Sequence, residues 1–105
     1  MEKPNLEYVE KLARGDEALR KRLIDIIKNE FPEEKEAYYK SLKNKDYKKT
    51  EENVHRLKHK IIILGLEENY KIANKFEHDL REFNLDRVED FDKILIAISY
   101  YLKTI

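Results

Sequence analysis

Apolar positions recur along the chain at the three- and four-residue spacing of amphipathic helices, in successive stretches separated by polar breaks. The first stripe follows Pro4-Asn5 and comprises Leu6, Val9, Leu12 and Ala13. It predicts a helix of two or three turns, which Gly15 ends, because glycine favours the position just after a helix. Asp16 can then cap a second helix through its side-chain oxygen. The inward face predicted for that helix comprises Leu19, Leu23, Ile26, Ile27 and Phe31.

Pro32 interrupts the second stripe. Proline lacks a backbone donor and disfavours helical geometry at the residue before it. The helical spacing nevertheless resumes at Glu33 and includes Ala37, Tyr38 and Leu42. The pattern predicts either one kinked helix or two helices placed almost end to end.

Three further helices are predicted after the polar turn at Asn44-Lys45-Asp46. A helix over about 47–64 carries the stripe Val54, Leu57, Ile61 and Leu64, with Asp46 as its N-cap and Gly65 as its C-terminal stop. The run from Ile61 to Ile63 also suits a strand, but the upstream stripe favours a helix. A helix over about 67–83 carries Ala73, Phe76, Leu80 and Phe83. The last, over about 88–103, carries Phe91, Ile94, Leu95, Ile98, Tyr101 and Leu102.

Length and composition agree with this pattern. The 105 residues, with only 2 Gly and 2 Pro, suit one domain over residues 1–105 and do not suit a β-rich fold. Short connections favour antiparallel neighbours, so we expect an all-α, up-and-down four-helix bundle with a short N-terminal helix at one end. The absence of Cys excludes disulfides, Cys-based metal centres and thiol nucleophiles. No apolar run is long enough to span a membrane, so a cytoplasmic location is expected.

The zero net charge hides an uneven distribution. Residues 40–60 contain eight Lys or Arg against three acids, and residues 77–92 contain seven acids against two Arg. Such runs are usually solvated helix faces, but a basic segment can also meet an acidic partner.

The chain has 3 His, at positions 55, 59 and 78. His55 lies at the edge of the apolar stripe in the 47–64 helix, where an exposed imidazole is expected. His78, beside Glu77 on the next helix, is best explained as an ordinary, partly exposed histidine. From position alone, His55 would be an ordinary surface residue too.

The segment from Val54 to Gly65 resembles the signature of histidine phosphotransfer (HPt) domains. That signature is His-x-Leu-Lys-Gly, a small or polar residue, and a second Gly ten positions after the His. In register with it are His55, Leu57, Lys58 and Gly65. The downstream residues Ile72, Ala73, Phe76 and Glu77 resemble the next helix of the family, and the turn at 44–46 resembles the turn before its His helix. Two positions depart from the pattern: His59 replaces the first Gly, and Lys60 replaces the small or polar residue.

The resemblance implies a phosphoryl carrier without an ATP site, rather than a true enzyme. His55 would be the phosphoacceptor, since an unperturbed imidazole offers a nucleophilic nitrogen at neutral pH. Lys58, one turn along the helix, would offset the phosphoryl charge. His59 would donate a hydrogen bond or restrict access. Partner contacts are expected from Arg56, Lys60 and Ile62, although Ile62 fits a core position slightly better.

The partners implied by the resemblance are receiver domains of response regulators and hybrid sensor kinases. We expect a monomer that contacts them transiently and holds no cofactor, because the receiver supplies Mg²⁺. Phosphoryl transfer depends mainly on positioning and charge neutralisation, so the carrier itself needs no nucleotide or metal motif.

Three other functions remain open on the sequence. His55 and His59 have the i, i+4 spacing of a helical zinc site, with Glu51 or Glu52 as a third ligand, although Lys58 and Lys60 oppose it. Nucleic-acid binding is disfavoured, because Tyr47 is the only aromatic residue in the basic segment. A degenerate HPt-like bundle, which binds receivers without transfer because His59 blocks it, is the main alternative.

Overall fold

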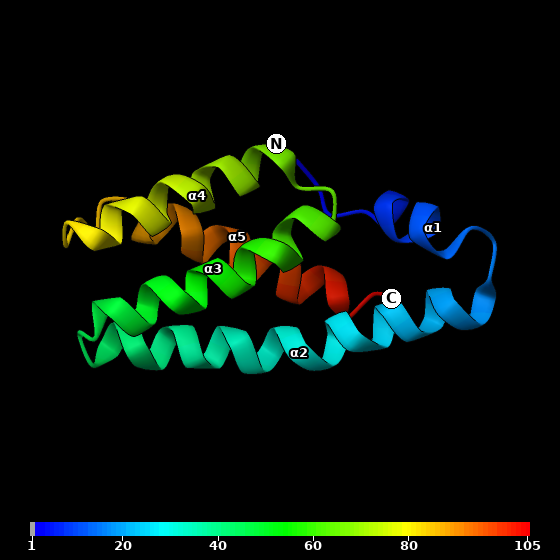
Figure 1. Ribbon diagram of the computed structural model, residues 1–105, viewed down its shortest axis with the longest axis horizontal. Coiled ribbons are helices and arrows are strands. Elements are labelled where there is room, and N and C mark those ends of the chain that lie inside the picture. The colour runs from blue at the N-terminus through cyan, green and yellow to red at the C-terminus, as the bar shows by residue number, and fades with distance from the viewer. Residues whose placement is uncertain (1) are drawn as a thin grey trace.

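The computed structural model describes residues 2–105, and every regular element within that range is an α-helix (Figure 1). The five helices are α1 (Glu7–Ala13), α2 (Glu17–Lys43), α3 (Tyr47–Ile63), α4 (Glu67–Arg81) and α5 (Val88–Leu102). None of these helices combines the length and the apolar character that a bilayer crossing requires. The all-α class and the order of helices predicted from the sequence are therefore confirmed.

The helices reverse direction at each short connection. Figure 1 shows α2 along one edge, α3 crossing between α2 and α4, and α5 behind them. Helix α3 packs against both α2 and α4, whereas α1 packs against α2. Helix α3 therefore lies between α2 and α4. Two of the three histidines are on α3, and the third is on α4.

Capping residues and a glycine that are recognisable in the sequence determine where several helices begin or end. The Asp16 carboxylate accepts a hydrogen bond from the Leu19 amide at 3.1 Å, and the Asp46 carboxylate accepts one from the Lys49 amide at 3.3 Å. Both caps satisfy backbone donors that a first helical turn leaves free. Gly65 follows α3 with a φ of +78°, a conformation that glycine adopts without strain. Pro32 neither ends nor divides α2, which runs continuously through it.

The N-terminal segment joins the ends of α3 and α4. The Glu2 carboxylate accepts hydrogen bonds from the amides of Glu68 at 2.7 Å and Asn69 at 2.9 Å. It therefore caps α4, whose own N-cap residue, Leu66, makes no side-chain bond. The Asn5 amide donates to the Leu64 carbonyl at 2.9 Å. These bonds fix the turn from which α4 runs alongside α3.

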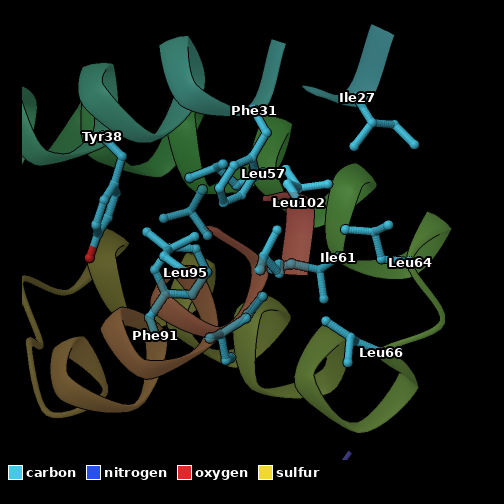
Figure 2. Close-up of a cluster of buried hydrophobic side chains, with 14 of the residues drawn as sticks. Ile27, Phe31, Tyr38, Leu57, Ile61, Leu64, Leu66, Phe91, Leu95 and Leu102 are labelled. Atoms are coloured by element: carbon cyan, nitrogen blue, oxygen red, sulfur yellow. The ribbon is translucent and has the colours of Figure 1, made fainter. Parts of the chain in front are cut away.

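The core lies where the apolar stripes of the helices meet (Figure 2). The stripe predicted for α3 is fully buried, including Ile61 in the β-branched run, which is helical as predicted. Helices α2, α4 and α5 contribute the large side chains Phe31, Tyr38, Phe76, Phe91 and Leu95. Because these side chains pack tightly around the inner face of α3, the helix is held rigidly. A side chain at the exposed edge of α3 is therefore held in a defined position.

Four side chains that the pattern placed in an apolar stripe or at a core position are exposed, namely Leu12, Ile26, Ile62 and Phe83. Helix α4 ends at Arg81, and Phe83 has a φ of +58° and is 73 % exposed, so the prediction that it closes the buried stripe of a helix over 67–83 is wrong. The amides of Glu82 and Asn84 bond to the Asp79 carbonyl, which turns the chain out of the helix before Phe83. On α2, Ile26 is 43 % exposed, and Ile24 is buried in its place.

Candidate functional site

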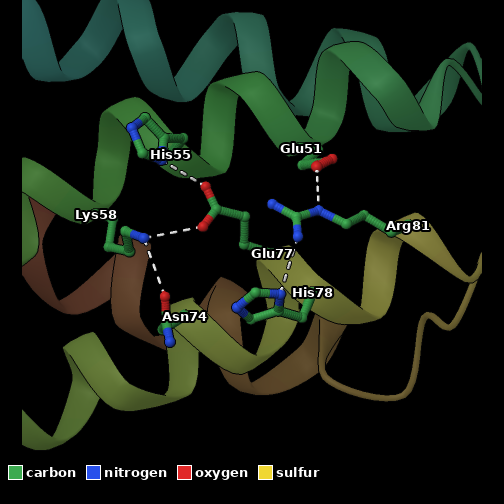
Figure 3. A network of polar contacts seen from close by, with 7 residues as sticks. All are labelled: Glu51, His55, Lys58, Asn74, Glu77, His78 and Arg81. Atoms are coloured by element: carbon green, nitrogen blue, oxygen red, sulfur yellow. Dashed lines mark hydrogen bonds and ion pairs between the residues drawn. The ribbon is translucent and has the colours of Figure 1, made fainter.

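His55 lies on α3 with its imidazole at the surface and one ring nitrogen bound to the neighbouring helix. The side chain is 57 % exposed, and its Nδ1 lies 2.6 Å from Oε1 of Glu77 on α4 (Figure 3). Val54 and Leu57, which flank it in the sequence, are fully buried and anchor the backbone. The imidazole is thus accessible to solvent yet held from beneath by a carboxylate.

Glu77 is a buried carboxylate with two partners. Its side chain is 6 % exposed, and its Oε2 accepts a hydrogen bond from Nζ of Lys58 at 2.9 Å. Burial alone raises the pKa of Glu77, but the hydrogen bonds and charges of Lys58 and His55 outweigh it and leave the pKa below its usual value of 4.5. Glu77 is therefore ionised at neutral pH.

An ionised Glu77 determines how protons are placed on His55. A carboxylate can only accept hydrogen bonds, so the 2.6 Å contact requires the proton to be on Nδ1. In the neutral imidazole the lone pair then lies on Nε2, at the other side of the ring. The arrangement orients a nucleophilic nitrogen away from the carboxylate.

Lys58 points toward α4 instead of into solvent. Its side chain is 8 % exposed, and Nζ donates to Glu77 and, at 3.0 Å, to Oδ1 of Asn74. The ammonium also lies 5.5 Å from the centre of the Tyr70 ring, within cation–π range. Lys58 and His55 therefore meet at one carboxylate, and Lys58 reaches His55 through Glu77.

The other two histidines occupy different surroundings. His59, one turn further along α3, is exposed, and its ring centre lies 5.1 Å from that of His55 with the planes at 71°. His78 is exposed on α4, where its Nδ1 accepts a hydrogen bond from Arg81 at 3.2 Å. Only His59 thus shares the surface face of His55.

Of the three residues expected to contact partners, the structure brings only Arg56 close to His55. Arg56 is exposed and lines, with His55, a groove of about 440 Å³ between α3 and α4. Lys60 is 12 % exposed and pairs across to α2, with Glu30 at 2.9 Å and Glu34 at 3.2 Å. Ile62 is 38 % exposed at the other end of α3 and borders a smaller hollow beside α1.

The groove beside His55 carries charges of both signs. Its walls include Lys48 and Glu52 from α3 and Arg81 from α4. Arg81 is held across it by Glu51, with Nε and Oε1 2.6 Å apart. Between residues 2 and 105 no group of three or more His, Cys, Asp or Glu side chains is arranged to hold a metal ion, so the third ligand considered at Glu51 or Glu52 does not join the two histidines.

Two members of the network, Glu77 and Asn74, were not among the site residues predicted from the sequence. Glu77 had a detectable signal, because it falls between Ala73 and Leu80 at the spacing of the buried stripe, where a carboxylate needs a partner. Asn74 offers no comparable signal. Its position at the edge of that stripe is typical of any half-exposed polar residue.

No family model, no curated protein and no solved structure matches the chain. The features of the chain that bear on function are therefore the motif and the geometry around His55.

Proposed function

We propose that this chain is a histidine phosphotransfer protein, which carries a phosphoryl group on His55 between receiver-domain aspartates of a two-component phosphorelay. In this proposal α2 to α5 form an up-and-down four-helix bundle of the HPt type, with α1 at one end. The observation that carries the proposal is the 2.6 Å contact between Nδ1 of His55 and the buried Glu77, on an imidazole that is 57 % exposed.

The reaction needs an oriented nucleophile. Nε2 of His55 would attack the phosphorus of an aspartyl phosphate on a receiver, and the P–O bond to the aspartate would break as the P–N bond forms. The aspartate leaves as a carboxylate, and the proton on Nδ1 stays in place, because Glu77 stabilises the positive charge that develops on the ring. Transfer to a second receiver is the same step in reverse. Metal ion chemistry belongs to the receiver, which by the resemblance supplies Mg²⁺.

Lys58 supports this step by holding Glu77. Its 2.9 Å bond to Oε2 and its burial keep the carboxylate ionised and turned toward His55. Lys58 is thus proposed as a positioning residue first, and as a direct counter-charge for the phosphoryl group only if its side chain turns outward. The exposed Arg56, in the groove beside His55, is the cation better placed to meet an acidic receiver surface.

A non-transferring interaction module is the second candidate, and one observation favours it. His59 replaces the Gly of the HPt pattern, and its ring lies 5.1 Å from that of His55 on the face that a receiver must approach. A side chain of that size can prevent the close contact that transfer requires while leaving a docking surface intact.

Transfer from a labelled receiver tests the proposal. A receiver phosphorylated with radioactive acetyl phosphate is mixed with the wild-type chain, with His55→Gln and with His78→Gln as the matched control. We expect acid-labile, alkali-stable label on the wild type and on His78→Gln, and none on His55→Gln. Label that persists in His55→Gln contradicts the assignment of the phosphoacceptor.

A further variant separates the two candidates. His59→Gly restores the residue of the HPt pattern. If the wild type binds receivers but takes no label while His59→Gly takes it, the chain is a degenerate module. If both take label, His59 is compatible with transfer.

A further inference from the structure

We propose that His55 and His59 form a two-histidine site for a divalent metal ion of the Zn²⁺, Ni²⁺ or Cu²⁺ class on the exposed face of α3. The site itself is independent of the phosphotransfer proposal. It rests on two exposed imidazoles one helical turn apart and on the pairing of the neighbouring lysine charges with carboxylates.

The spacing and exposure of the two rings suit chelation. Histidines at i and i+4 lie on one helical face, and here both are exposed with ring centres 5.1 Å apart. An edge-to-face arrangement at 71° already keeps the two rings together. Two histidines at this spacing on one helical face can share one metal ion through a nitrogen of each ring.

Glu77 prepares His55 as a metal ligand. Histidines that bind metal ions usually donate their other ring N–H to a carboxylate, which fixes the tautomer and strengthens the ligand. Nδ1 of His55 donates to Glu77 over 2.6 Å in this way, which leaves Nε2 as the free nitrogen.

In the sequence, the positive charges of Lys58 and Lys60 argue against a metal ion at the two histidines. In the structure, both lysines are paired with carboxylates. Lys58 donates to Glu77 at 2.9 Å, so its charge is balanced beneath the ring. Lys60 lies on the α2 side, paired with Glu30 and Glu34. Neither ammonium group is free beside the two imidazoles, and the exposed Arg56, which lines the groove with His55, is the cation that remains near them.

Two protein ligands imply an exchangeable ion. The part of the chain that the structure describes offers no third His, Cys, Asp or Glu to complete a closed site, so water would fill the other positions. Affinity should follow the order Cu²⁺ above Ni²⁺ and Zn²⁺ that nitrogen ligands impose. If the proposed phosphotransfer holds, metal and phosphoryl group compete for Nε2 of His55, and each excludes the other.

Calorimetric titration with Zn²⁺ alone, in a buffer that does not coordinate metals, tests the site without any receiver. We expect one ion per chain in the wild type, and affinity lower by about 100-fold in His55→Gln and in His59→Gln, since each variant loses the gain from chelation. His78→Gln removes an exposed histidine outside the pair and should bind like the wild type. Glu77→Gln should weaken binding by about tenfold, the usual effect of losing an outer carboxylate.

Imidazole resonances give a second measurement that needs no substitution. Zn²⁺ should shift the ring signals of His55 and His59 together and leave those of His78 in place. The proposal is wrong if the wild type shows no saturable binding, if His59→Gln retains wild-type affinity, or if His78→Gln loses it. Failure of phosphotransfer with intact Zn²⁺ binding would refute the proposed function alone.

Discussion

Replacing Glu77 with Gln should destabilise the protein by about 2 kcal/mol at neutral pH. The substitution keeps the shape of the side chain and removes its charge. It leaves the Lys58 ammonium, 8 % exposed, without the carboxylate that lies 2.9 Å away. A buried charge without its partner is the physical origin of the loss.

The size of this loss in stability depends on the hydrogen-bond partners that Lys58 keeps in the variant. Removing one partner of a buried ion pair costs about 3–5 kcal/mol. Here the ammonium retains Oδ1 of Asn74 at 3.0 Å, and the new amide still offers an oxygen acceptor. These contacts reduce the cost to about 2 kcal/mol, which corresponds to a fall in Tm of about 8–16 °C for a domain of this size.

The pH dependence has a definite sign. The pKa of Glu77 in the folded state is below its ordinary value of 4.5, because Lys58 and His55 together outweigh the effect of burial. Its contribution to stability is therefore complete above about pH 5 and is lost as the pH falls through the folded-state pKa. The difference in unfolding free energy between wild type and Glu77→Gln should be constant near neutrality and shrink in acid.

Urea unfolding of both proteins between about pH 3 and pH 7 measures this difference. Glu51→Gln is the matched control, because it removes the exposed ion pair with Arg81 on the same groove and should cost no more than about 1 kcal/mol. A difference between wild type and Glu77→Gln that stays the same down to the lowest pH would refute the ionised, paired state of Glu77. Equal losses in the two variants would refute its burial as the cause.

Four substitutions test other parts of the fold by the shift of their urea midpoints. Gly65→Ala should cost more than about 1 kcal/mol, because φ is +78° and the added carbon would lie 2.5 Å from the Asn5 side chain; a smaller loss would mean that Asn5 moves freely. Asp46→Ala removes the N-cap of α3 and should cost about 1 kcal/mol, and no loss would show that the cap is not formed. Phe83→Ser should change stability by less than about 1 kcal/mol, whereas Phe76→Ala should cost about 3–5 kcal/mol, and similar losses would contradict the exposure of Phe83.

The pattern of apolar residues was sufficient to predict where the helices lie. The apolar stripe of each helix and the capping residues at its ends are both local features of the sequence. The limits of α3 and α5 agree with the predicted ones to within one residue at each end. At Pro32 the pattern allowed either one kinked helix or two helices. Whether the helix continues depends on how firmly its neighbours hold it, and Phe31, 1 % exposed, is anchored in the core.

The errors at Phe83 and Ile26 have the same physical source. Both residues fall at helical spacing. The spacing of apolar residues does not show at which residue the helical hydrogen bonds end. It also does not show which residues of a wide apolar face are buried. At Phe83 the helix had already ended through bonds to the Asp79 carbonyl. On α2, Ile24 took the buried position that the pattern had given to Ile26.

Only the part of the candidate site that lies on α3 was predictable from the sequence. His55 and its neighbour Lys58 belong to one helix, so spacing relates them. The contact with Glu77 joins residues 22 positions apart in the sequence on separate helices. It depends on how α3 and α4 pack, which the pattern does not specify. The burial of Lys58 follows from the same contact, so it too was outside the reach of the sequence.

Glu77 also distinguishes an oriented imidazole from a merely exposed one. A carboxylate accepts hydrogen bonds and does not donate them, so it selects the tautomer of His55 with the proton on Nδ1. An amide at the same place can donate or accept, and Glu77→Gln would remove this selection while leaving the exposure of His55 unchanged. Any chemistry at Nε2, whether phosphoryl transfer or metal binding, should therefore weaken in Glu77→Gln. A role of His55 that depends on its surface position alone should not.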